Sequence, residues 1–599
     1  MGAQIPVTHA GPQFMNMGSD VGFSVWSGMP ADWSRHNFQF RDSLAVVRGS
    51  HEIKVGVDII KGYHLDAEYW NTDGAYSWGS DRTGSAYGDL LLGLPASFNQ
   101  VSPTYWTGDR YLRMFFAQDT WRVNRKLTVI LGARYEPMQN WKSREGEQVV
   151  FAPGQQSIMY PNMPPGTLYD GDNGAPPRGF WDQWGISRLG PRLGFAYDLG
   201  GDGKTSIRGG VGIYHDALNN AGASWMGTSI PFTGGVDITN PFSTTDPYNG
   251  HVNPFPIPVP TPSTWPIDLP VTSYMFNPNF QTAKNTQYNL TVERQLPRAM
   301  MLRVAYVGSL SGNLTRGRDA NAAYYIPGND AEGNPLSTLD TANMDSRRPI
   351  KNYEQMYVAD SDGHGDLNSL LVTLERRLSR TLGFQVNYTL SRQMDNALLS
   401  GDSPTHGVRI NPHGDGNDIW SVADQDATHH LAGNFNWNLP SPHGNAFLRQ
   451  VVGGWQSTGI LTLVSGTPLA LYSATGQSLT SVRPYADYIP GCNASSHAGS
   501  DPRLMWFNTA CFQEAALGTW GTAKRNMLRG PGMADVDWGM YKNFKVTEKL
   551  NIQFRSEFFN LFNHTNFGSP GTRVPNSDFG QIWSASDPRI LQFALRLSF

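Results

Sequence analysis

Apolar and polar residues alternate along several segments of the chain, each about 10 to 13 residues long. In 285–296, Tyr288, Leu290 and Val292 occupy alternate positions, and polar residues fill the positions between them. Residues 381–392 and 550–562 repeat this pattern, and 589–599 place Leu or Phe at every second position from Leu591 on. Because successive side chains of a strand point to opposite faces, the pattern predicts strands with one apolar and one polar face.

Short and long links alternate between the predicted strands. Short links rich in Gly, Pro and Asn close seven hairpin pairs, as is usual for tight turns. Connectors of about 25 to 70 residues join successive pairs. In an up-and-down sheet all short turns lie at one end and all long loops at the other. The predicted pairs are 37–48/51–62, 110–122/126–138, 191–198/204–214, 285–296/299–309, 367–379/381–392, 428–439/450–465 and 535–545/549–562, followed by one final strand.

Strand length separates two all-β architectures. Strands of soluble sandwiches are most often about 5–6 residues long. Ten residues at about 3.3 Å each and about 45° tilt span about 23 Å, close to the apolar band of an outer-membrane barrel. We therefore predict an all-β fold, an antiparallel up-and-down transmembrane β-barrel with long extracellular loops and short periplasmic turns.

The parity of the strands predicts one more. Seven pairs and a final strand make fifteen, and an up-and-down barrel has an even number, so about 16 strands are expected. The additional strand is expected within 13–27. The predicted organisation is an N-terminal partial segment, 1–36, with one strand, followed by the barrel domain, 37–599.

Composition excludes several classes of protein. The 599 residues carry a formal net charge of −4, and 16% of them are charged. The chain has no apolar run of about 18 residues, which excludes a helical membrane protein. It has no basic block either, so no nucleic-acid partner is expected. The first residues, MGAQIPVTHAG, show no export signal.

Apparent chemical motifs have structural explanations. GGDGKT (200–205) resembles a phosphate-binding loop, but Asp198 stands where that motif needs Gly, so a hairpin turn is predicted. His429 and His430 are adjacent in a predicted strand and point to opposite faces, which argues against a shared metal ion. Residues 360–363 and 413–416 hold parts of a calcium loop without the full ligand series, and calcium on a loop stays open. No nucleophile–base–acid arrangement stands out, so we expect no enzyme, no cofactor and no metal site.

The only two cysteines, Cys492 and Cys511, lie in the same long connector, 466–534. We predict a disulfide that closes a loop of 20 residues and removes about 3 kcal/mol of unfolded-state entropy. The alternative is two free thiols.

Two further groups of residues each have two interpretations. Connector tryptophans either contact a ligand or pack on one another to close the barrel mouth. Charges on the predicted inner face, such as Arg134/Glu136 and Arg555/Glu557, either line a substrate pathway or neutralise each other. The tryptophans are Trp70, Trp78, Trp181, Trp184 and Trp265.

Nearly the whole chain from about residue 35 resembles one family. FRSEFFNLFNHTNFGSP (554–570) and FGQIWSASDPRILQFALRLSF (579–599) resemble the end of TonB-dependent transporters of the Oar-like branch. GDLLLGLP (88–95), FFAQDTWRVNRKLTVILGARYEP (115–137) and RNMLRGPG (525–532) agree with it.

The resemblance implies a bacterial outer-membrane barrel of 22 strands with a plug, energised through TonB. It also implies that the terminal Phe599 is part of the signal read by the barrel-assembly machinery. No plug or TonB-contacting segment is recognisable here, so we expect the C-terminal, plug-lacking barrel portion of a solute-uptake receptor. The expected partners are outer-membrane lipid, the barrel-assembly machinery, TonB through a plug absent from this chain, and a solute.

The identity of that solute stays open between a small molecule, a peptide and a saccharide. Two other functions remain as alternatives. The first is a passive outer-membrane porin, and the second is a soluble secreted β-protein that binds carbohydrate.

Overall fold

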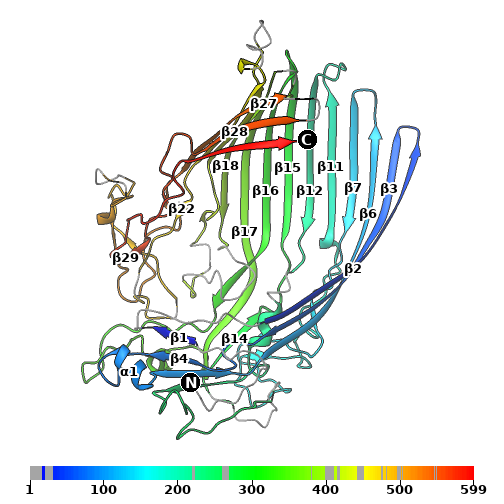
Figure 1. Cartoon of the computed structure of the whole chain (residues 1–599). Coiled ribbons are helices and arrows are strands. Elements are labelled where there is room, and N and C mark those ends of the chain that lie inside the picture. The colour runs from blue at the N-terminus through cyan, green and yellow to red at the C-terminus, as the bar shows by residue number, and fades with distance from the viewer. Residues whose placement is uncertain are drawn as a thin grey trace.

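One large, curved antiparallel sheet dominates the computed structural model (Figure 1). Short turns lie at one end of its strands and long connectors at the other (Figure 1). The structure describes residues 16–19, 31–218, 223–258, 267, 269–378, 381–397, 411–414, 419–441, 451–473, 476–480, 482–495, 501, 503–545, 547 and 550–599.

Twenty strands of the described residues belong to this sheet, and fifteen of them form its continuous antiparallel part, which we call the barrel wall. Each pairs antiparallel with the next wall strand along the chain. All seven predicted hairpin pairs and the final strand are confirmed. Residues 200–203 form the predicted hairpin turn between two paired strands. The strands are β2 (Ala31–Arg48), β3 (His51–Glu68), β6 (Thr104–Arg122), β7 (Leu127–Tyr135), β11 (Leu189–Asp198), β12 (Thr205–His215), β15 (Lys284–Leu296), β16 (Met300–Asp319), β17 (Tyr353–Arg376), β18 (Leu382–Asp395), β20 (His429–Asn438), β21 (Trp455–Val464), β27 (Met533–Lys545), β28 (Asn551–Phe559) and β30 (Ile590–Ser598).

The N-terminal strand expected within 13–27 does not join the wall where the structure describes that segment. Only β1 (Asn16–Ser19) is described there, and its four residues span about 13 Å, too short to cross a membrane. It pairs in parallel with β4 (Ala75–Trp78) in a separate sheet that also holds β5 (Ser97–Val101) and β13 (Gly235–Thr239). The wall itself begins at Ala31, inside the predicted N-terminal segment.

The first and last strands of the wall each have one described neighbour. β2 pairs with β3, and β30 pairs with β28. Fourteen antiparallel steps separate β2 from β30, so the two strands run in the same direction. A barrel that is antiparallel throughout could therefore close between β2 and β30 only through an odd number of additional strands.

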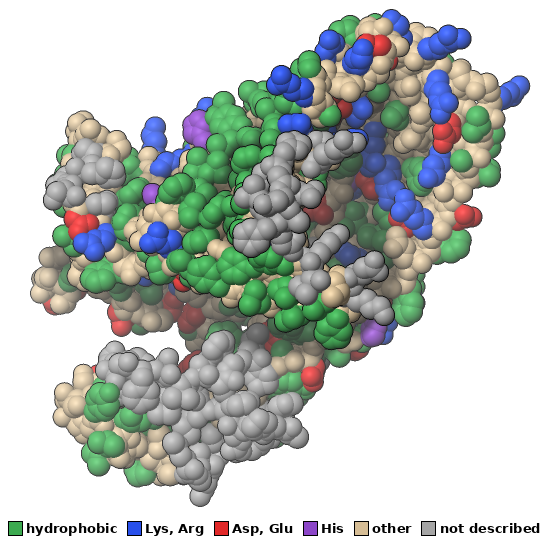
Figure 2. Space-filling view, turned by 45° about the horizontal axis from the view of Figure 1, so that its top comes forward, with side chains coloured by type: hydrophobic (Ala, Val, Ile, Leu, Met, Phe, Trp, Pro, Cys, Tyr) green, Lys and Arg blue, Asp and Glu red, His purple; other side chains and the backbone are tan. Residues whose placement is uncertain are grey.

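The two faces of the wall differ as the alternation predicts. On β15, Leu290 and Val292 are 49% and 40% exposed, whereas Glu293 on the opposite face bonds to Arg303 of β16. Figure 2 shows a broad area of hydrophobic side chains over the middle of the view, and charged side chains in the hollow at its right. The soluble alternative requires the apolar stripes to be buried in a compact core, and the structure exposes them instead.

The long connectors build small structures of their own at one end of the wall. β16 and β17 reach into this region, and the 24 residues of β17 extend over about 80 Å. None of the helices among the described residues is both long enough and apolar enough to cross a membrane. The connector elements are α1 (Ala86–Leu92), α3 (Thr341–Ser346), β8 (Lys142–Ser143), β9 (Val150–Phe151), β10 (Thr167–Leu168), β14 (Val271–Phe276), β19 (Ser421–Val422), β22 (Pro468–Leu469), β23 (Tyr472–Ser473), β24 (Asp487–Tyr488), β25 (Phe512–Gln513), β26 (Leu528–Arg529), β29 (Arg573–Val574) and the 3-10 helices η1 (Ile186–Arg188), η2 (Trp225–Thr228) and η3 (Thr509–Cys511).

A charge on the outward face of β15 should destabilise the folded protein. Leu290→Arg places a cation in hydrocarbon near mid-strand and should lower the free energy of unfolding by about 2–4 kcal/mol. Asn289→Arg, on the inner face one residue away, is the matched control and should cost less than about 1 kcal/mol. Guanidinium titration of the protein folded in phosphatidylcholine vesicles measures both values. Equal losses for the two variants would contradict the assigned faces.

Candidate functional site

A polar pocket of about 450 Å³ lies on the inner face of β15 to β18, near the end of the wall that carries the long connectors. Most of the polar residues that line it carry an amide or a hydroxyl group. The hydroxyl of Ser309 donates a hydrogen bond to Oδ1 of Asn285 (2.7 Å). Such groups both donate and accept hydrogen bonds, which suits the recognition of a polar solute. The polar side chains lining it include Asn285, Gln287, Asn289, Ser309, Ser311, Gln393 and Asp395.

Charged side chains on the inner face neutralise one another. Arg134 donates to Glu136 (2.7 Å), which confirms this predicted pair, and a carboxylate oxygen of Asp58 lies 3.7 Å from the same guanidinium. The second predicted pair is wrong in its partners. Arg555 donates to Gln553 (2.7 Å), and the Tyr541 hydroxyl donates to Glu557 (3.0 Å). Gln553 lies on the same strand as Arg555, and Tyr541 lies on the neighbouring strand β27; the sequence does not reveal which of its neighbours each charged side chain bonds.

A buried arginine ties the longest C-terminal connector to the polar pocket. Arg525 is almost fully buried and donates to carboxylate oxygens of Asp395 (2.7 Å) and Asp424 (2.8 Å). Asp395 ends β18 and also lines the pocket. A buried guanidinium held by two carboxylates fixes its segment in one position. The connector 465–532 is therefore anchored beside the pocket.

The carboxylates of the segment that resembles a calcium loop form ion pairs with arginines. Asp360 and Asp362 lie within β17, not in a loop, and they bond to Arg318 (2.6 Å) and Arg316 (2.6 Å). Of 413–416, the structure describes only the first two residues. Within the described part of the chain, no group of three or more His, Cys, Asp or Glu residues is placed to hold a metal ion.

The connector tryptophans divide between the two interpretations. Trp78 is buried against Tyr76 in a small aromatic core, where it serves packing. Trp70, Trp181 and Trp184 are about half exposed and remain accessible to a ligand. Trp265 lies outside the described residues.

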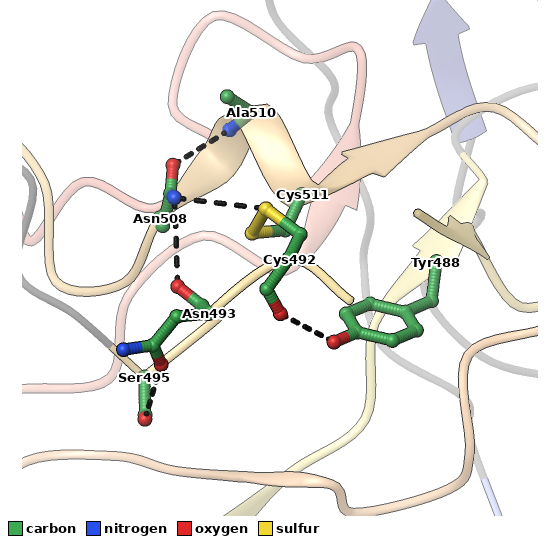
Figure 3. The surroundings of a disulfide bond; sticks show 7 residues. All are labelled: Tyr488, Cys492, Asn493, Ser495, Asn508, Ala510 and Cys511. Atoms are coloured by element: carbon green, nitrogen blue, oxygen red, sulfur yellow. Dashed lines mark hydrogen bonds between the residues drawn. A yellow bond between two sulfur atoms is a disulfide. The ribbon is translucent and has the colours of Figure 1, made fainter. Parts of the chain in front are cut away.

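A disulfide joins Cys492 and Cys511 within the connector 465–532 (Figure 3). The Asn508 amide donates to the carbonyl oxygen of Asn493 (3.4 Å) and contacts the sulfur of Cys492 (3.8 Å). The Tyr488 hydroxyl donates to the carbonyl oxygen of Cys492. Cys511 is fully buried in the hydrophobic core of this connector, so the disulfide links Cys492 covalently to that core.

One connector carboxyl has a strongly shifted pKa. Burial of Glu147 in the connector 136–188 raises its pKa to about 7, and the Ser143 hydroxyl donates to its Oε2 (3.2 Å). This side chain therefore changes charge near neutral pH.

Sequence reasoning did not find the pocket or the role of Arg525. The arginine and its partner Asp395 are 130 residues apart, and only the fold brings them together. Phe599, the predicted assembly signal, directly follows β30 and is fully exposed.

Comparisons with known proteins cover nearly the whole length of this chain. A family model described as an outer membrane beta barrel domain matches residues 3–592. The outer membrane transporter YddB from Escherichia coli is similar with a TM-score of 0.50 and 10% identity, over 98% of this chain and 57% of that one. A search of curated proteins found no match.

Two further solved structures are similar at lower scores. The ferripyoverdine receptor of Pseudomonas aeruginosa, bound to ferripyoverdine, has a TM-score of 0.44 and 12% identity, over 95% of this chain and 49% of that one. The ferric yersiniabactin uptake receptor FyuA from Yersinia pestis has a TM-score of 0.40 and 10% identity, over 96% and 56%. The chain thus spans about half the length of the solved structures that it matches.

Removing the Arg525 guanidinium should release the connector 465–532. Arg525→Gln leaves two partly buried carboxylates without their cation, which costs about 3–5 kcal/mol locally. Limited proteolysis of the connector should become at least about tenfold faster. Arg503→Gln is the matched control, because its ion pair with Asp501 is exposed and should contribute little. Equal cleavage rates for both variants would contradict the anchoring role.

Peptide mapping tests the disulfide directly. Digestion without reductant should recover the peptides of Cys492 and Cys511 as one linked species, which separates after reduction. Recovery of both peptides with free thiols before reduction would exclude the bond in the protein.

Proposed function

The chain belongs to the outer membrane beta barrel domain family, and on that premise we propose that it is the barrel portion of a TonB-dependent receptor for solute uptake. The protein lies in the bacterial outer membrane. The proposal assigns solute capture to the extracellular connectors and passage to the polar inner face of the wall.

The observation that carries this proposal is the polar pocket at the connector end of the inner face. Its wall residue Asp395 also holds Arg525 of the connector 465–532. A solute that reaches the pocket therefore lies beside an anchored loop of the barrel mouth. The amides and hydroxyls of the pocket favour a solute rich in hydrogen-bonding groups, such as a peptide or a saccharide.

Gating belongs, in this proposal, to a plug that is not recognised within this chain. TonB would act on that plug and would not contact the wall. The C-terminal motifs support assignment to the Oar-like branch. The exposed Phe599, directly after the last wall strand, is the residue that we assign to recognition by the barrel-assembly machinery.

Uptake by living cells tests the proposal. Ser309→Trp fills the inner-face pocket and should reduce uptake of fluorescent oligopeptides or oligosaccharides at least about tenfold. Tyr306→Trp is the matched control, since Tyr306 lies on the outward face of the same strand and is 42% exposed. Outer-membrane levels of both variants are measured alongside.

The same assay separates the receptor from a passive porin. Uptake through a receptor should disappear when the tonB gene is deleted or the proton gradient is collapsed. Uptake that persists under both conditions and rises linearly with solute concentration would favour the porin. Unchanged uptake by Ser309→Trp would remove the pocket from the pathway.

A further inference from the structure

A second pocket opens on the outward face of the wall, where β18, β20, β21 and β27 meet the long connectors. Its volume is about 790 Å³, and apolar side chains provide most of its lining. Four of the residues that line it, one from each strand, form a row that we call the floor, and these are Tyr388, Leu431, Leu463 and Ala534. The pocket is separate from the polar pocket on the inner face.

Register places the four floor residues in one cross-strand row. Tyr388 pairs with Leu431, Leu431 with Leu463, and Leu463 with Ala534. Tyr388 alternates with inward-facing Asn387, so the whole row faces outward with the apolar stripe of the wall. The floor of the pocket is therefore continuous with the membrane-facing surface.

Two connectors form the roof of the pocket. Trp506 and Pro531 come from the connector 465–532, and Phe567 comes from the connector 560–589. The indole nitrogen of Trp506 donates to the carbonyl oxygen of Arg529 (2.8 Å). The backbone nitrogen of Ala534 donates to Oδ1 of Asn566 (2.8 Å), which ties the second connector to β27. The first bond orders the connector 465–532 internally, and the second fixes the connector 560–589 to the wall.

Polar groups lie at the edge of this apolar space. His429 shares a hydrogen bond with the Tyr388 hydroxyl (2.8 Å), and His564 contributes a second imidazole. Arg392, four residues beyond Tyr388 on the outward face of β18, is exposed. The apolar stripe of β18 ends at Leu390, so Arg392 marks the level at which hydrocarbon gives way to headgroups.

We propose that this pocket binds one acyl chain of a phosphate-bearing membrane lipid from the outer leaflet. The chain lies between the floor row and the roof aromatics, where it is removed from water and from exchange with bulk lipid. The phosphate lies toward Arg392, because basic side chains at the membrane surface attract anionic headgroups. Lipid covers every outward face of a barrel, but here residues of two connectors add a second side to the site, and the acyl chain held between them and the floor is a retained ligand.

Native mass spectrometry of the full chain, extracted from outer membranes in mild detergent, tests the proposal. The wild-type protein should retain one lipid per chain, identified as phosphate-bearing by fragmentation. Ala534→Trp and Leu463→Trp fill the pocket, and either should reduce the retained fraction at least tenfold. Val292→Trp, outward on β15 and away from the pocket, is the matched control and should retain the lipid.

The headgroup is tested by Arg392→Gln, which should weaken retention of phosphate-bearing lipids several-fold. A wild-type chain without retained lipid would overturn the proposal. So would equal retention in the filled-pocket variants and the control, or a retained molecule without an acyl chain.

Heat-dependent mobility in gels verifies that each variant is folded. If both filled-pocket variants misfold, delipidated wild-type protein is titrated with palmitoyl-oleoyl-phosphatidylglycerol in micelles. Saturation at one lipid per chain supports the proposal, and adduct numbers that rise without saturation overturn it.

Discussion

Hydrocarbon offers no hydrogen-bond partner to a backbone amide or carbonyl, and this constraint organises the whole molecule. Each backbone group within the membrane must be paired by a neighbouring strand, so the chain crosses as one continuous antiparallel ladder. One face of every strand then meets lipid and the other meets water. The alternation along β15, β18 and β30, and the exposed Leu and Phe side chains of the outer surface, follow from that requirement.

Beyond the membrane, water can pair the backbone again, and the chain is free to build connectors. Here stability comes from small aromatic cores, from the disulfide of Cys492 and Cys511, and from buried arginines held by carboxylates. Arg525 is one of these arginines, and it joins a connector to Asp395 at the inner polar pocket. The same connector also roofs the outer apolar pocket, so one segment borders both the water-filled and the lipid-facing side of the wall.

Sequence reasoning succeeded where one local rule applies and failed where distant segments meet. All fifteen wall strands were predicted, since period two is a property of each strand alone. The sixteenth strand was placed within 13–27 by parity, and β1 in that segment pairs with β4 of a connector instead. Residues 360–363 resemble part of a calcium loop in the sequence, yet β17 continues through Asp360 and Asp362, and arginines neutralise both.

The sequence by itself determined the fold class, the strand pairs and the end of the barrel at which the long connectors lie. It did so because each membrane strand must present apolar residues to lipid and polar residues to water, and this alternation can be recognised within each strand alone. Only the tertiary structure decided where the connectors rest, which carboxylates hold Arg525, and which side chains line the two pockets. Those contacts join residues far apart in the chain, and no periodic rule relates the two members of such a pair.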